Sequence, residues 1–295
     1  MSSRILLFGH GFIGSHLART LHDRDDRIVA VNRTGDPSSP YPLLAADLDD
    51  PDSLDRIRAT LEFTPDLVIH CASSGRGGPD AYRAVFLRGS RHLLAAFPDS
   101  PLLFTSSTSV YGQTDGSVVD EESPTEPGTE TGQTLVETES EVLAANGVVL
   151  RLAGLYGPGR SIYLQLLLQG KATIERGEVS RTLNQVHRDD VVSSVLHFID
   201  HGSPTGGGAV FNVVDDVSLS QRECYEALAE RFSLPVPPEA EPNPDRKRAW
   251  THKRVSNEKL RSLGWRPKYP GYFDALDNDP ELISSIRERI SQSHG

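Results

Sequence analysis

The sequence is poor in the features that mark secreted, membrane-spanning and nucleic-acid-binding proteins. It has two cysteines, Cys71 and Cys224, too few and too distant for a disulfide scaffold or a cysteine zinc site. No apolar run approaches the roughly 18 residues that a membrane helix needs, and MSSRILLFGHG at the start lacks a signal-peptide pattern. The net charge is −11, which disfavours binding to nucleic acid and to anionic membranes. We expect a cytoplasmic globular protein that binds neither and holds no metal.

Short apolar runs alternate with amphipathic stretches over the first half of the chain, which predicts βαβ units and a parallel sheet. We therefore expect an α/β fold, a Rossmann doubly wound parallel sheet with a smaller C-terminal substrate-side domain. The predicted strands are 4–8, 27–31, 42–46, 66–70, 101–105, 148–152 and 209–214. The predicted helices are 14–23, 52–61, 81–97, 132–145, 189–200, 220–232 and 280–292, with long loops at 112–132 and 233–250.

The pattern loosens after residue 152, which suggests a division into two regions. The expected NAD(P)-binding domain covers residues 1–155, with return elements near 182–214. The smaller substrate-side region is expected at 156–181 and 215–295.

A glycine-rich loop follows the first predicted strand and opens the first predicted helix. It reads GHGFIG, with Gly9, Gly11 and Gly14 in the GxGxxG spacing and Phe12 and Ile13 between the last two. In this context the spacing predicts a dinucleotide site, because backbone can approach a pyrophosphate and the helix N-terminus attracts anions. A glycine-rich turn without a ligand is the alternative.

The end of the second predicted strand bears on the choice of cofactor. It reads VNRT, with Asn32 and Arg33 where an acidic residue would bind the ribose of NAD. An arginine there suits the 2′-phosphate of NADP, so NADP is favoured and NAD is possible; a solvated surface arginine is the alternative. Asp47 and Leu48 are expected at the adenine edge, or else in an ordinary acidic loop.

Several stretches together resemble the extended short-chain dehydrogenase/reductase family, which includes NAD(P)-dependent epimerases and dehydratases. The resemblance implies cofactor contacts at Ala72 and Ser73, and it implies that Ser107 holds a substrate carbonyl or hydroxyl. It covers residues 4 to about 215 and continues more loosely in KRVSNEKLRSLGWRPKYPGY. The matching stretches are FGHGFIGSHL, AADLDD, VIHCAS, FTSSTSVYG, RLAGLYGPG and NQVHRDD.

The chain departs from this family at the acid/base pair. The family carries a tyrosine some two dozen residues after the serine and a lysine four residues further on. Thr131 and Leu135 occupy those positions here, and the first lysine of the chain is Lys171. Three further departures are Phe8 in the glycine pattern, Phe86 in place of a helix asparagine and Gly154 in place of a substrate-holding asparagine.

Other side chains could act on a small-molecule substrate. Tyr111 is the nearest remaining phenol, although packing is an alternative to catalysis. Tyr156 and Arg160 in LYGPGR are expected at the substrate, with packing and surface exposure as their alternatives. The basic segment 246–254 either grips a phosphate or carboxylate, docks a partner or forms a solvated face.

Three functions stay open at this stage. The favoured one is an NADP-binding oxidoreductase that transfers hydride to or from an unknown small carbonyl or sugar-like substrate, with Ser107 orienting it. The alternatives are a non-catalytic NAD(P)-binding sensor or scaffold and a nucleotide-sugar epimerase or dehydratase. A homodimer is possible. Fold alone does not decide between these three functions.

Overall fold

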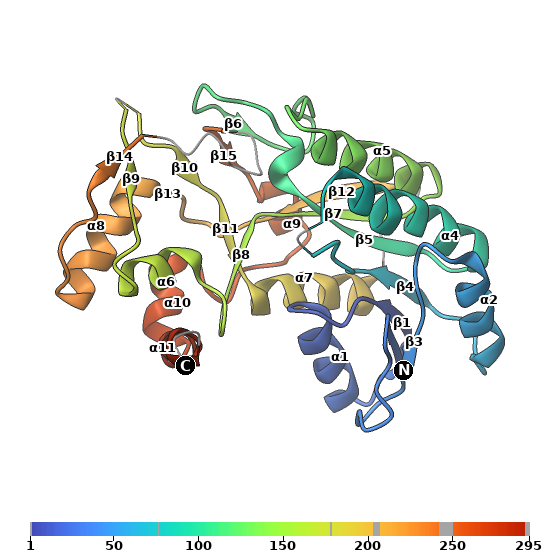
Figure 1. Ribbon diagram of the computed structural model, residues 1–295. Helices are drawn as coiled ribbons and strands as arrows, with labels where there is room; N and C mark the ends of the chain where they lie inside the picture. The colour runs from blue at the N-terminus through green and yellow to red at the C-terminus, as the bar shows by residue number, and fades with distance from the viewer. Residues whose placement is uncertain (1, 76, 178, 203–206, 242–249, 293–295) are drawn as a thin grey trace. The chain divides into compact units, whose positions relative to one another are not determined.

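A seven-stranded sheet forms the centre of the fold (Figure 1). The computed structural model describes residues 2–75, 77–177, 179–202, 207–241 and 250–292. The strand order is β12-β7-β5-β4-β1-β2-β3, and the pairs from β5 through β3 are parallel. The fold is therefore the expected Rossmann-like α/β architecture. The strands are β1 Arg4–Phe8, β2 Arg27–Asn32, β3 Leu43–Ala45, β4 Leu67–His70, β5 Leu102–Ser107, β7 Val148–Leu152 and β12 Ala209–Val213.

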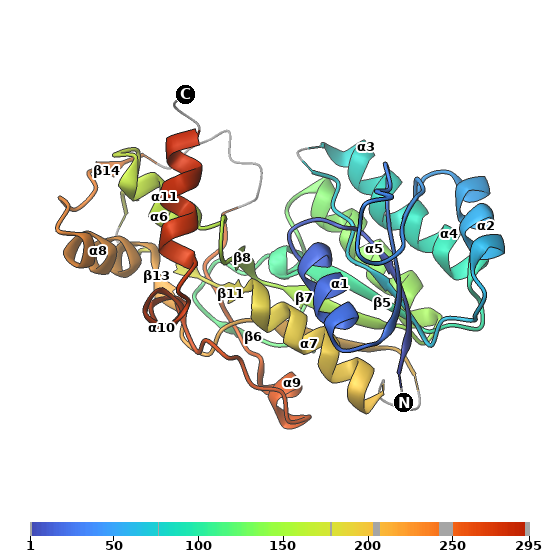
Figure 2. The ribbon, with the colours of Figure 1, turned by 90° about the horizontal axis from the view of Figure 1, so that it is seen from below.

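Helices cover both faces of this sheet, as expected for a doubly wound fold. Figures 1 and 2 show α1 and α7 on one face and α4 and α5 on the other. The central strands are almost entirely apolar, and their side chains are buried because they are covered from both sides. The helices are α1 Gly14–Asp23, α2 Pro51–Thr60, α3 Pro79–Tyr82, α4 Gly89–Ala96, α5 Glu130–Ala144 and α7 Arg188–His201.

The chain divides into two compact units. The first contains residues 1–110, 125–151 and 192–211, and the second contains 111–124, 152–191 and 212–295. This division differs from the boundaries expected from the sequence, because 111–124 belongs to the second unit.

The second unit is built from short strands and helices around its own apolar core. Tyr156, Leu164, Tyr225, Tyr272 and Ile286 are among the buried side chains of that core. Its helices are α6 Ile162–Leu168, α8 Gln221–Phe232, α9 Glu258–Ser262, α10 Tyr272–Asn278 and α11 Leu282–Gln292. Its strands are β6 Val118–Val119, β8 Gly154–Tyr156, β9 Ile174–Glu175, β10 Thr182–Leu183, β11 Gln185–His187, β13 Leu219–Ser220, β14 Glu239–Ala240 and β15 Arg254–Val255.

Two regions differ from their sequence-based prediction. The helix expected over 81–97 is broken into α3, a π-helical stretch η1 at Arg83–Arg88, and α4. The loop expected over 112–132 contains β6, and α5 begins before its end because the Thr129 side chain accepts the N–H of Gly132 as an N-cap. Of the loop expected over 233–250, residues 242–249 lie outside the described residues. No helix among the described residues is long and apolar enough to cross a membrane.

Candidate functional site

Four parallel strands end at one edge of the sheet in the first unit. Their register pairs Phe8 with Val31 and with His70, and pairs His70 with Phe104. The segments that follow these strands therefore emerge next to each other. They are the glycine loop, the Arg33 turn, the Ala72 segment and the Ser107 segment. In open α/β sheets, this carboxyl edge is where ligands bind.

The three glycines of the loop serve different purposes. Gly9 has φ +107°, and a Cβ on it would lie 2.4 Å from the Ala72 nitrogen. A Cβ on Gly14 would lie 1.8 Å from the Gly9 carbonyl oxygen, so α1 could not start so close to the loop. A Cβ on Gly11 would meet nothing within 4 Å, and Gly11 is exposed. The first and third glycines are thus needed for packing, whereas the second leaves open space for a ligand to approach the backbone.

The start of α1 offers a favourable environment for an anion. No acidic residue lies in its first turn, and the preceding residue, Ile13, makes no side-chain cap. Ile13 is buried and Phe12 is half-buried, so the loop presents mainly its backbone. Backbone N–H groups at a helix N-terminus stabilise phosphate groups. These residues fit the pyrophosphate of a dinucleotide.

The turn after β2 is organised by Asn32. Its Oδ1 accepts the backbone N–H groups of Thr34 at 2.9 Å and Gly35 at 2.6 Å, which bends the chain directly after the strand. Arg33 lies in this turn, is exposed, and makes no ion pair with the described residues. An arginine without an acidic partner beside the glycine loop fits a phosphate group.

The remaining predicted cofactor residues flank the same edge. Asp47 is exposed, and its Oδ1 accepts the Asp49 N–H at 3.0 Å, whereas Leu48 is buried. Ala72 is half-buried beside Gly9, and Ser73 is exposed, with its hydroxyl accepting the Gly75 N–H at 3.1 Å.

His70 fixes the start of the Ala72 segment. Its ring is fully buried, with Nε2 donating to the Val85 carbonyl at 3.0 Å and Nδ1 accepting the Ala72 N–H at 3.4 Å. Burial lowers the pKa of His70 to about 4, so the ring is neutral at pH 7. Phe86, where the family carries an asparagine, stacks on this ring at 6.1 Å.

Ser107 ends β5, and helix α5 packs against that strand. Ser107 is half-buried, and its Oγ accepts the Ser109 N–H at 3.2 Å. On α5, Leu135 is buried, and the hydroxyl of Thr131 pairs with that of Thr129 at 3.2 Å. Neither Thr131 nor Leu135 carries a side chain that can act as a base at neutral pH or lower a phenol's pKa.

A buried ion pair lies further along α5. Arg151 on β7 donates to the Glu139 carboxylate through Nε at 3.0 Å and Nη2 at 2.7 Å. Ser106 on β5 donates to the same carboxylate at 2.5 Å. The three side chains join α5, β5 and β7 inside the first unit.

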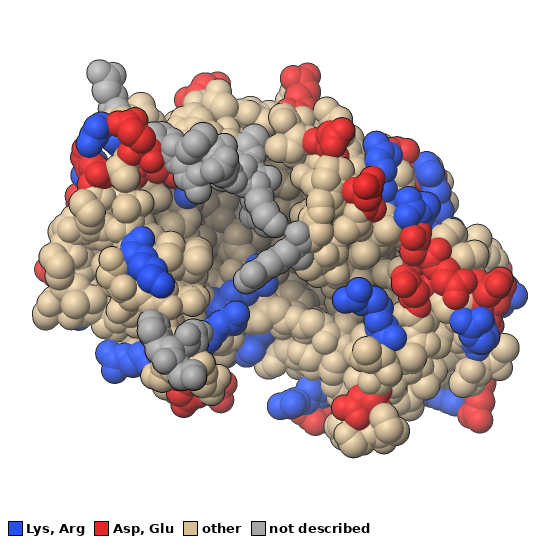
Figure 3. Space-filling view, in the orientation of Figure 1, with Lys and Arg blue, Asp and Glu red and all other residues tan. Residues whose placement is uncertain are grey.

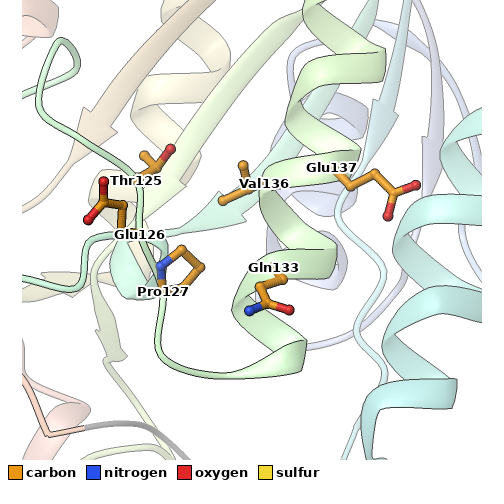
Figure 4. A pocket seen from close by; sticks show the side chains of 6 residues that line it. All are labelled: Thr125, Glu126, Pro127, Gln133, Val136 and Glu137. Atoms are coloured by element: carbon orange, nitrogen blue, oxygen red, sulfur yellow. The ribbon is translucent and has the colours of Figure 1, made fainter.

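The outward face of α5 borders an open hollow of about 480 Å³ (Figure 4). Gln133, Val136 and Glu137 line it from the helix. These positions are three and four residues apart and share a face, whereas Thr131 and Leu135 lie on another face. The hollow is therefore separate from the positions of the missing acid/base pair.

Tyr111 belongs to the second unit and is fully buried. Its hydroxyl donates to Asn212 Oδ1 at 2.9 Å, and its carbonyl accepts the Lys253 ammonium at 2.8 Å. This environment favours packing over catalysis. Lys253 is itself buried, so it does not contribute to a solvated basic face, and residues 246–249 of that basic segment lie outside the described residues.

Tyr156 is also buried, and its hydroxyl donates to Asp215 Oδ2 at 2.9 Å. Asp215 Oδ1 has no hydrogen-bond partner among the described residues, and burial raises the pKa of Asp215 well above its usual range. Tyr156 thus packs in the core of the second unit, as in the alternative to substrate contact. Arg160 is exposed and closes a turn in which its backbone exchanges hydrogen bonds with Gly157.

Charge on the surface is mixed. Figure 3 shows acidic and basic side chains interspersed on the face it displays, without a continuous basic stripe among the described residues there. The described residues contain no group of three or more His, Cys, Asp or Glu side chains that could hold a metal ion.

Comparison with known proteins decides the family. The profile of the NAD dependent epimerase/dehydratase family matches residues 5–213. The chain belongs to this family. By family it is therefore an NAD-binding, oxidoreductase-like protein, as the resemblance noted in its sequence motifs implied.

Curated relatives and solved structures agree with this membership. A UDP-glucose 4-epimerase of Mycolicibacterium smegmatis is 28% identical and covers 90% of this chain and 88% of its own. Protein YeeZ of Escherichia coli K12 is 29% identical over 79% of this chain and 85% of its own. The fold matches the structure of Thermus thermophilus UDP-glucose 4-epimerase in complex with NAD, with a TM-score of 0.79 at 24% identity over 96% of this chain and 99% of that one.

Some contacts at these sites could not be inferred from the sequence. The Lys253 ammonium reaches Tyr111 across 142 positions, and His10 bonds to Tyr41 across 31. The basic run 246–254 drew attention to Lys253, but no pattern indicated that its side chain points inward. The other positions of the cofactor edge were signalled by the glycine spacing and by the ends of the predicted strands.

Proposed function

We propose that this family member prefers NADP and transfers hydride to or from a small carbonyl or sugar-like substrate, without a tyrosine–lysine relay. The observation that carries the NADP preference is Arg33, an exposed arginine without an acidic partner among the described residues, in a turn that Asn32 bends beside the glycine loop. Asn32 is uncharged and does not repel a phosphate, as an aspartate there would. The first unit, which contains the glycine loop and Arg33, would hold the cofactor.

In this proposal the glycine loop binds the pyrophosphate at Gly11, and Arg33 pairs with the 2′-phosphate. Asp47, Leu48, Ala72 and Ser73 would border the rest of the dinucleotide. A bound nicotinamide supplies the hydride donor or acceptor.

Ser107 would orient the substrate. Its Oγ accepts the Ser109 N–H, its hydroxyl donates to no acceptor among the described residues, and it is half-buried at the end of β5. Orientation of two reactants lowers the barrier of a transfer step without any proton relay. Because Thr131 and Leu135 cannot form a relay, water or another substrate-side group would supply the proton. Arg160 is exposed and is proposed to contact an anionic substrate. Tyr111 and Tyr156 are buried, so we propose that they pack in the second unit and do not contact the substrate.

Two other functions have specific support. A non-catalytic dinucleotide sensor or scaffold is supported by Thr131 and Leu135 on α5, since it needs no acid or base. A nucleotide-sugar epimerase is supported by the relatives with that name, but Gly154 and the missing pair stand against it. Turnover of bound cofactor with panels of carbonyls and nucleotide sugars separates the three functions.

The cofactor assignment is tested by calorimetric titration with NADP and NAD. Arg33→Ala should weaken NADP ten- to a hundredfold and NAD much less, because a charge-assisted contact contributes about 1.5–3 kcal/mol. Gly11→Val should weaken both dinucleotides while leaving the fold intact, since its side chain would enter open space. Equal weakening of both by Arg33→Ala, or a wild-type preference for NAD, would contradict the NADP assignment.

A further inference from the structure

A hydrogen bond joins the glycine loop to the loop that carries Arg33. The phenol of Tyr41 lies 2.9 Å from His10 Nε2, and the two rings are 5.9 Å apart. His10 is the residue between Gly9 and Gly11. Tyr41 lies near the end of the segment that connects β2 to β3, of which we call residues 33–41 the 33–41 loop.

The other anchors of the 33–41 loop tie it to its own two strands. Asn32 Oδ1 accepts the N–H groups of Thr34 and Gly35 at the start of the loop. The Asp36 N–H donates to the Leu43 carbonyl at 3.0 Å, across the loop to β3. These bonds set the shape of the loop, and the Gly9 N–H, which donates to the Val31 carbonyl at 2.9 Å, ties the glycine loop to the end of β2. The Tyr41–His10 bond adds a link at the other end of the 33–41 loop.

The Tyr41 side chain is buried, with 7% of the residue exposed. One side of its ring contacts the edge of His22 at 5.6 Å, and the residue also borders an open hollow of about 390 Å³. Burial lowers the pKa of His10 and raises the pKa of Tyr41, so both groups are uncharged at neutral pH. The nearby charges are Asp36 in the loop and Arg19 and Asp23 on α1. The contact is thus a neutral hydrogen bond beside open space.

We propose that the Tyr41–His10 hydrogen bond is a specificity-determining support of the cofactor site. It holds the 33–41 loop, and therefore Arg33, at the distance from the glycine loop that the 2′-phosphate requires. This inference rests on the proposed NADP site. Tyr41 and His10 are positioning residues, because they act through Arg33.

The reason that this support favours NADP over NAD is preorganisation. Only NADP carries the phosphate that Arg33 would bind, so only NADP must order the 33–41 loop when it binds. A loop that is already fixed lowers this ordering cost. Without the hydrogen bond, NADP would lose affinity while NAD, which does not use Arg33, would bind nearly as before.

The experiment measures the ratio of NADP to NAD dissociation constants by calorimetry. Tyr41→Phe keeps the ring and removes only the hydroxyl, and it should reduce the preference for NADP by about three- to tenfold, the range for one hydrogen bond. His10→Ala should reduce the ratio similarly. The double variant should lose no more than either single one, because both remove the same bond. Ser38→Ala is the matched control: it removes a bond to Asp36 inside the loop and should leave the ratio unchanged.

The outcomes test the Tyr41–His10 support separately from the proposed NADP site. An unchanged ratio in Tyr41→Phe, additive losses in the double variant, or an equal loss in Ser38→Ala would overturn the inference while the NADP site stands. Wild-type protein that binds neither dinucleotide would refute the proposed function, and the inference with it. Thermal unfolding of each variant should confirm that the fold is retained.

Discussion

Replacement of Arg151 by methionine should strongly destabilise the first unit. The guanidinium donates at 3.0 and 2.7 Å to Glu139, and the two side chains are 7% and 3% exposed. Arg151→Met leaves a buried carboxylate whose one remaining donor among the described residues is the Ser106 hydroxyl. Breaking such a pair costs about 3–5 kcal/mol, because the remaining charge is uncompensated.

The assay is urea unfolding followed by far-ultraviolet circular dichroism, because Trp250 and Trp265 both lie in the second unit. Arg91→Met is the matched control. It breaks an exposed pair with Glu141, which lies on α5 as Glu139 does, and it should lower the free energy of unfolding by under about 1 kcal/mol. The double variant Glu139→Leu/Arg151→Met should recover most of the loss. Equal losses of unfolding free energy in Arg151→Met and Arg91→Met would refute this reasoning.

Two further predictions concern catalysis and pH. If the protein turns over a substrate, Ser107→Ala should lower kcat by about a hundredfold or less, as for one hydrogen-bond donor. Tyr111→Phe should lower kcat much less. Abolished turnover in a folded Tyr111→Phe variant would contradict a mechanism without a tyrosine–lysine relay. Burial raises the pKa of Asp190 to about 6 and that of Asp215 well above its usual range, so both carboxyls stabilise the fold at low pH and lose that contribution as pH rises through their folded-state pKa values. Thermal unfolding should therefore show Asp215→Asn gaining stability relative to wild type between pH 5 and 8, and a constant difference across that range would count against a neutral Asp215.

The sequence predicted the first strand and the first helix well because their signals are local. Glycine spacing, an apolar strand before it and an amphipathic helix after it occupy adjacent positions, and β1 and α1 begin and end where expected. The second strand was likewise predicted to within one residue, at 27–31 against Arg27–Asn32.

In the second unit, α8 and α11 lie where helices were expected, but the strands were not predicted, because their contacts are distant in the chain. Its strands are two or three residues long, too short for a period-two pattern to be recognised. Tyr156 shows the same limit at a single residue: its burial depends on Asp215, 59 positions away, and no pattern around LYGPG contains that information. The break of the 81–97 helix into π-helical η1 was also missed, because its apolar spacing continues through the break.

The pairing of β15 with β6 bears on how the protein matures on the ribosome. The backbone of 113–119 is hydrogen-bonded to that of 252–256, and the Lys253 side chain reaches the Tyr111 carbonyl. The two paired segments are therefore about 140 residues apart in the chain. At about 5–20 residues per second of synthesis, β6 waits on the order of ten seconds for its partner strand. During that interval the segment directly after Ser107 has no native anchor from 252–256. A nascent chain that has emerged only as far as residue 213, the end of the family match, should therefore expose 111–119 to protease, and protection should appear only after Ser256 has emerged.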